Sequence, residues 1–147
     1  MSPVTLRRCT YDEVDTALFA GYAAESSIAA LGPARPQAAT YRAMEEYGLL
    51  YLIGAWRDGH MVGFISFLVS ELPHYGQRTA TAESYYVAPE HRQGGVGLKL
   101  LHAAEALAKE VGAVGFFVSA PMGGRLAEVM PRIGYKETNR VFFRGLM

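Results

Sequence analysis

One segment of the chain limits its fold more than any other: an apolar stretch, a glycine cluster and an amphipathic stretch follow one another between residues 85 and 111. Glycines stand at positions 94, 95 and 97, where a chain can turn sharply and a ligand can approach the backbone. Beyond them, apolar residues recur at helical spacing on one stripe. These are Val96, Leu100, Ala103, Ala104, Leu107 and Val111. The segment predicts a strand, a glycine turn and a helix.

The start of this predicted helix lacks the residues that normally satisfy its free N–H groups. Its first turn has no acidic residue, and no Ser, Thr, Asn or Asp stands at a capping position. An external anion could accept those hydrogen bonds, and Arg92 adds a positive charge beside the turn. Two common phosphate-binding motifs do not fit, because Gly97 is followed by Leu98 and because Leu100 stands where a third glycine is needed.

The pattern that does fit is Arg-x-x-Gly-x-Gly, formed by Arg92, Gly95 and Gly97 and preceded by Tyr-Val-Ala-Pro-Glu-His. It resembles the acyl-CoA pyrophosphate loop of the GNAT superfamily of N-acetyltransferases. The alternative is a glycine-rich turn that only packs a helix tightly on a sheet and binds no ligand.

Strands and helices alternate along the rest of the chain. Thr10 and Glu13 form a capping-box pattern, which predicts a helix that opens there. Asp58 and Gly59 between two apolar runs predict a β-hairpin. The predicted strands cover residues 4–10, 49–56, 61–70, 79–87, 114–119 and 137–143, and the predicted helices cover about 10–27, 37–47, 96–111 and 124–133.

Composition narrows the class of partner. The 147 residues suit a single domain, residues 1–147, and 50% of them are hydrophobic. Fourteen basic residues balance fourteen acidic ones, so no net field favours nucleic acid or an anionic membrane. The longest apolar run, 61–69, is too short to span a bilayer. With one cysteine and no apolar signal core at the N-terminus, a cytoplasmic location is expected.

The resemblance covers nearly the whole chain and implies a mixed α/β sheet in the order β-α-α-β-β-β-α-β-α-β. In the GNAT fold the fourth and fifth strands diverge to admit the pantetheine arm of acetyl-CoA, which pairs with backbone groups of the fourth strand. Backbone amides of the glycine turn hold the pyrophosphate. The cofactor-binding residues that the resemblance implies are Tyr85, Tyr86, Val87, Arg92, Gln93, Gly94, Gly95, Val96, Gly97 and Leu98.

Glu83 is the candidate general base. It stands just before the cofactor segment, where several family members place a glutamate, and a lysine-type amine with a pKa near 10.4 must lose a proton before it attacks a thioester. Strand alternation would place it on one face with Thr81, Tyr85 and Val87. The alternative is that Glu83 only forms an ion pair, with Arg78 for example.

The general acid departs from the family pattern. Where the family often has Tyr-x-x-x-Gly-Phe/Tyr, this chain has Met130, which cannot donate a proton, followed by Gly134 and Tyr135. Tyr135, Tyr85 and Tyr86 are the candidate donors, and each could equally serve in aromatic packing.

The leading hypothesis is transfer of an acetyl group from acetyl-CoA to a primary amine by direct attack in a ternary complex. The acceptor would be a small molecule or a peptide. The alternative is a catalytically weak acyl-CoA-binding or sensing module of the same fold, because the usual tyrosine is missing. The scattered histidines predict no metal site. The apolar segment 141–143 would suit pairing with a second copy as a homodimer.

Overall fold

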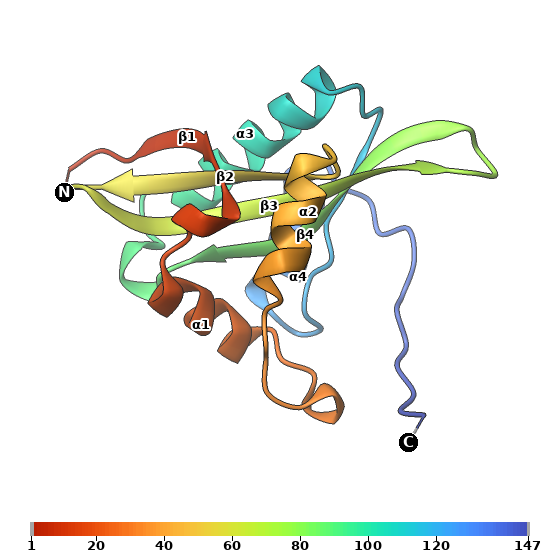
Figure 1. The fold of residues 1–147 in the computed structure, drawn as a ribbon, viewed down its shortest axis with the longest axis horizontal. Coiled ribbons are helices and arrows are strands. Elements are labelled where there is room, and N and C mark those ends of the chain that lie inside the picture. Colours follow the sequence, from red (N-terminus) through yellow and green to blue (C-terminus); the bar gives the residue numbers. More distant parts are fainter. Residues whose placement is uncertain (1, 147) are drawn as a thin grey trace.

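A computed structural model describes residues 2–146, and they form one mixed α/β unit (Figure 1). The strands are β1 (Thr5–Cys9), β2 (Leu50–Arg57), β3 (His60–Leu72), β4 (Gln77–Val87) and β5 (Phe116–Phe117). The helices are α1 (Thr16–Glu25), α2 (Ala38–Glu46), α3 (Val96–Glu110) and α4 (Arg125–Arg132). Three short 3₁₀ turns accompany them, namely η1 (Tyr11–Glu13), η2 (Ala29–Leu31) and η3 (Pro89–His91).

The strands form a single sheet in chain order, β1-β2-β3-β4-β5. The first four are antiparallel, and β5 runs parallel to β4. The Asp-Gly turn between β2 and β3 is confirmed: Asp58 and Gly59 have φ angles of 51° and 80°, which a tight hairpin requires. The mixed sheet predicted from the sequence is therefore present.

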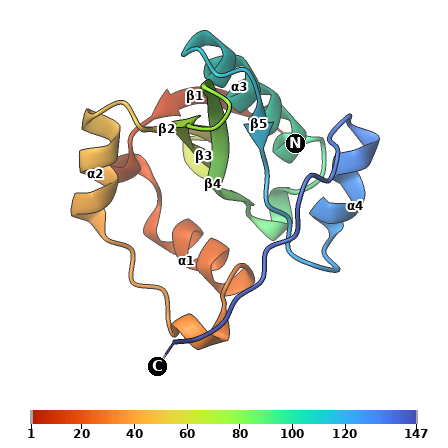
Figure 2. The ribbon, with the colours of Figure 1, turned by 90° about the vertical axis from the view of Figure 1, so that its right-hand side faces the viewer.

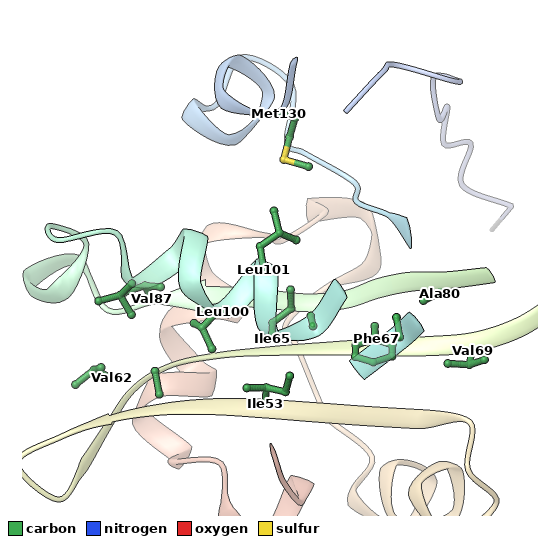
Figure 3. Close-up of a cluster of buried hydrophobic side chains, with 14 residues drawn as sticks. Ile53, Val62, Ile65, Phe67, Val69, Ala80, Val87, Leu100, Leu101 and Met130 are labelled. Carbon is green, nitrogen blue, oxygen red and sulfur yellow. The ribbon is translucent and has the colours of Figure 1, made fainter. Parts of the chain in front are cut away.

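Helices cover both faces of the sheet, with α3 on one side and α1 on the other (Figure 2). Side chains alternate across β3, so that Ile65 and Phe67 join the core under α3 while Phe64 packs toward α1. Figure 3 shows the larger core, in which Leu100 and Leu101 of α3 lie over the sheet and Met130 of α4 closes one end. Met130 is only 7% exposed and packs in this core.

The first helix begins later than the sequence predicts, at Thr16 rather than near residue 10. The capping-box pattern of Thr10 and Glu13 is present, with the Thr10 N–H donating to Glu13 Oε1 at 3.2 Å, but it closes only the η1 turn. Extended backbone follows, and α1 begins after Asp15, whose carboxylate accepts from the Leu18 N–H at 2.9 Å. Because Asp15 offers a second N-cap a few residues later, the chain breaks between the two signals.

The predicted final strand, residues 137–143, is also absent from the described structure, where residues 135–146 have no regular secondary structure. The predicted strand 114–119 shortens to the two residues of β5. An edge strand as short as β5 offers few hydrogen bonds to a further strand. The C-terminal segment that contains residues 137–143 instead runs away from the sheet in Figure 1, and Val141 and Phe142 are 83% and 88% exposed.

Candidate active site

The glycine turn has the geometry that the sequence predicts. After β4 and η3, Gly94 and Gly95 adopt φ angles of 82° and 76°, in the left-handed region that favours glycine. Gly95 is the N-cap of α3, and no side chain caps the first turn. A Cβ atom added at either glycine would have no neighbour within 4 Å, so the backbone is open to a ligand there. Free N–H groups, helix dipole and open space together fit a bound pyrophosphate.

Arg92 braces this turn rather than standing free beside it. Its Nε donates to the Val87 carbonyl at 2.8 Å, and its Nη2 donates to both carboxylate oxygens of Glu25 at 2.8 and 2.9 Å. The guanidinium also lies 5.4 Å from the centre of the Tyr86 ring. Arg92 therefore ties the turn to β4 and to α1, and Glu25 offsets part of its charge.

Strands β4 and β5 pair over two residues only. Ala80 lies opposite Phe116 and Thr81 opposite Phe117, after which β5 ends while β4 continues to Val87. The predicted divergence of the two strands is therefore present. It leaves the β5-facing edge of residues 82–87 without a strand partner in the described structure, beside the glycine turn.

Glu83 lies where β4 departs from regular pairing with β3. Ser66 pairs with Ser84 and Phe67 with Ala82, so Glu83 is the extra residue of a β-bulge. The bulge overturns the predicted alternation. Tyr85 contacts Gly97 on the α3 side, whereas Glu83 meets side chains of the α1 and α2 side.

Hydrogen bonds hold the carboxylate of Glu83 at both oxygens. Ser66 Oγ donates to Oε1 at 3.0 Å, and Tyr41 Oη donates to Oε2 at 3.0 Å. Tyr22 Oη donates to the backbone carbonyl of Glu83 at 3.1 Å. The predicted alternative partner, Arg78, instead donates to the Val111 carbonyl. The site is thus assembled from α1, α2, β3 and β4.

A second layer fixes Ser66. Its Oγ lies 2.6 Å from Ser84 Oγ and accepts from the Ser84 N–H at 3.1 Å, and both serines are buried.

Burial raises the pKa of Tyr41, and the neighbouring negative charge of Glu83 adds to this shift. Tyr41 therefore remains a hydrogen-bond donor to the carboxylate through the physiological pH range.

Tyr135 lies elsewhere. Its Oη donates to Glu105 Oε2 at 2.5 Å, on α3, and it packs against the core on that face. Burial, reinforced by the bond to Glu105, raises its pKa. Burial likewise raises the pKa of Tyr85 to about 12. The structure therefore does not bring the two predicted catalytic residues together, because the contacts of Glu83 come from one face of the sheet and those of Tyr135 from the other.

Two adjoining hollows of about 620 and 440 Å³ lie around the segment that joins α1 to α2. The smaller one is lined by Phe19, Tyr22 and Tyr41 on one side and by residues of the 26–37 segment on the other. Because Tyr22 and Tyr41 also bond to Glu83, this cleft leads toward the carboxylate. Both hollows are lined by residues of the α1–α2 region, whereas the glycine turn lies at the start of α3.

The sequence did not single out Ser66, Tyr22 or Tyr41 as site residues. A serine at position 66 within an apolar strand is one signal that a buried polar partner is near.

Among residues 2–146, no cluster of three metal-ligating side chains is present. Within the same residues, no helix is long and apolar enough to cross a bilayer.

Comparison with known proteins identifies the class. Residues 18–124 match the acetyltransferase (GNAT) family model, which is more than half of the chain. The chain therefore belongs to the GNAT family, whose acetyltransferases take the acetyl group from acetyl-CoA.

A curated relative, aminoglycoside N(6')-acetyltransferase type 1 of Acinetobacter genomosp. 13, is 34% identical over 65 residues. That match spans 44% of this chain and 44% of the relative, so less than half of the relative's length is represented.

Solved structures share the fold over almost the whole chain. An aminoglycoside acetyltransferase, meta-AAC0020 from an uncultured soil metagenomic sample, in complex with trehalose, has a TM-score of 0.78 at 18% identity and covers 98% of this chain and 97% of its own. Aminoglycoside N-acetyltransferase AAC(6')-Iy in complex with CoA has a TM-score of 0.75 at 20% identity, with 99% and 96% covered. Ribosomal-protein-alanine N-acetyltransferase from Brucella melitensis biovar Abortus 2308 has a TM-score of 0.74 at 19% identity, with 97% and 99% covered.

Proposed function

We propose that the protein is an N-acetyltransferase that moves the acetyl group of acetyl-CoA to a primary amine by direct attack in a ternary complex. The observation that carries this proposal is the placement of Glu83. Its carboxylate is held by Ser66 and Tyr41 just beyond the last residues that pair β4 with β5, and Tyr41 also lines the α1–α2 cleft.

The donor would lie along β4 and over the glycine turn. The unpaired edge of residues 85–87 suits the amide groups of pantetheine, and the N–H groups of residues 93–98 suit the pyrophosphate. Bound acetyl-CoA supplies a thioester whose carbonyl carbon accepts the amine. On this arrangement, Arg92 acts by bracing the turn from Val87 and Glu25, and it contributes only part of its charge to the phosphates.

The acceptor would enter from the α1–α2 cleft as an ammonium ion. Glu83 takes its proton, directly or through water, and leaves the nitrogen lone pair free to form the new C–N bond as the C–S bond breaks. Ser66 and Tyr41 fix the carboxylate in one orientation, so the proton acceptor is in place before the amine arrives. No residue of the chain is acetylated in this scheme, and the buried Cys9 takes no part.

Of the three candidate donors for the leaving thiolate, Tyr86 is the one on the Glu83 face, where its ring packs with Tyr22 and Phe64 and is largely buried. The usual family position and Tyr135 supply no donor on that face. Met130 is buried in the core, and Tyr135 is engaged by Glu105. This observation keeps a second candidate function in view, an acyl-CoA-binding or sensing module with weak catalysis. In the enzyme reading, water or the proton released by the amine neutralises the thiolate.

The variant Glu83→Gln separates the two candidates. The amide keeps the shape of the side chain but cannot take a proton, so we expect the rate of CoA release with an amine acceptor to fall about 10²–10⁴-fold. Acetyl-CoA affinity, measured by titration calorimetry, should be unchanged. Glu71→Gln on the exposed part of β3 is the matched control and should keep its rate. Equal rates for the two variants would remove Glu83 from the mechanism.

A further inference from the structure

The cleft beside Glu83 has walls that are aromatic and aliphatic. Phe19, Tyr22 and Tyr41 line it, and the Phe19 ring packs edge-on against both tyrosines, at centroid distances of 5.5 and 6.2 Å. The mouth carries Ile28 and Leu31, which are 48% and 66% exposed. Such surfaces gain from covering a flat or branched apolar group, and a tyrosine face also attracts a single ammonium ion.

The charges around the cleft point the same way. Arg35 is the charged residue that lines it, and within the described residues its guanidinium forms no ion pair. In the adjoining hollow, the carboxylate of Asp12 is engaged by Arg42 at 2.9 Å. The lining of the two hollows thus offers no carboxylate besides the engaged Asp12, and Glu83 adjoins the cleft through Tyr41. A ligand with several ammonium groups would find no further anionic partner among these lining residues.

We propose that the acceptor is a primary amine on an aromatic or branched apolar body, with no positive charge besides the amine that is acetylated. This inference rests on the proposed function, because it assigns the acceptor of that same site. The ammonium group lies at Glu83, and the apolar body lies in the cleft against Tyr22 and the exposed side chains of Ile28 and Leu31. Arg35 at the mouth disfavours multiply charged amines. A polyamine or an aminoglycoside would leave desolvated charges unpaired.

Amine binding, read without turnover, tests the proposal. The protein saturated with CoA is titrated calorimetrically with 2-phenylethylamine and, separately, with kanamycin, which carries several ammonium groups. We expect the dissociation constant for 2-phenylethylamine to be at least tenfold lower than that for kanamycin. Tighter or equal binding of kanamycin, or no binding of either amine, would overturn the proposal. Normal amine binding without acetyl transfer would instead overturn the proposed function alone.

Two cleft variants and one charge-matched control locate the effect. Arg35→Glu should strengthen kanamycin binding about tenfold, whereas Lys109→Glu, which makes the same charge change on α3 across the sheet, should not alter it. Leu31→Ser should weaken 2-phenylethylamine binding several-fold, and since Leu31 is largely exposed, the variant should fold normally. If Arg35→Glu and Lys109→Glu behave alike, the charge of the cleft mouth does not select the acceptor.

Discussion

At the scale of single residues, the site depends on one extra amino acid in β4. Without the bulge, Glu83 would share the face of Tyr85 and Val87 and would point toward α3. With it, the carboxylate faces α1 and α2, where Ser66 and Tyr41 hold it. Sequence alternation alone cannot reveal a bulge, because the register depends on pairing with the neighbouring strand.

Replacing Ser66 tests how far this support matters. In Ser66→Ala the Glu83 carboxylate loses one donor, and Ser84 loses the partner of its hydroxyl and its N–H. We expect the free energy of unfolding to fall by about 1–3 kcal/mol, the cost of buried polar groups left without partners. The rate of acetyl transfer should fall as well, with acetyl-CoA affinity unchanged.

Denaturant unfolding and CoA-release kinetics measure the two effects. Ser70→Ala is the control, since Ser70 stands on the same strand but is exposed. A Ser66→Ala protein as stable and as fast as Ser70→Ala would show that the buried serine pair supports neither the fold nor the carboxylate.

At the scale of elements, the turn signals that contain glycine were correct. Asp58-Gly59 made the hairpin, and Gly94 and Gly95 made the turn into α3, because positive φ angles suit few other residues. The elements that failed depend on something outside themselves. The helix start moved to a competing cap at Asp15, and residues 137–143 found no strand of sufficient length beside them.

The glycine turn carries a prediction at this scale. Gly95→Val places a branched side chain at φ 76° in the open space where the pyrophosphate would lie, so CoA affinity should fall at least tenfold. Gly76→Val is matched to it: φ is 63°, and a Cβ there also meets nothing within 4 Å, but the position lies in the turn between β3 and β4. Calorimetric titration with CoA should find the second variant unaffected.

Both variants should lose about 1–2 kcal/mol of stability, the usual cost of a left-handed conformation for a residue with a Cβ. A common loss of stability combined with different CoA affinities would assign the effect to the ligand. Unchanged affinity in Gly95→Val would remove the turn from the cofactor site.

At the scale of the whole molecule, the C-terminal segment exposes a row of apolar side chains. Val141, Phe142 and Leu146 are 83%, 88% and 91% exposed, although the sequence of 137–143 is typical of a strand. Exposed apolar residues in such a row favour association. The homodimer expected from the sequence therefore stays a prediction.

Sedimentation velocity at micromolar protein concentration tests whether the chain forms this homodimer. We expect a species of twice the 16.0 kDa chain mass, and Phe142→Asp should shift it to the monomer. Val114→Asp, at a 69% exposed apolar site far along the chain, should not. A wild-type protein that sediments as a monomer would refute the dimer.

The family and the whole-molecule architecture were accessible from the sequence because the glycine turn is specific and the strands around it are strongly patterned. The acceptor side was not, since it is formed by residues from α1, α2, β3 and β4 that meet only in the fold. Tyr22 and Tyr41 become site residues through their bonds to Glu83, which no spacing in the sequence predicts.

Acetyl transfer itself is tested by titrating the purified protein with acetyl-CoA and then, in the same sample, following thiol release on addition of 2-phenylethylamine. We expect saturable acetyl-CoA binding and CoA release that starts only when the amine is present. Binding of acetyl-CoA without release in the presence of any amine of a wider panel, including polyamines, aminoglycosides, amino acids and peptides, would contradict this expectation and favour the binding module.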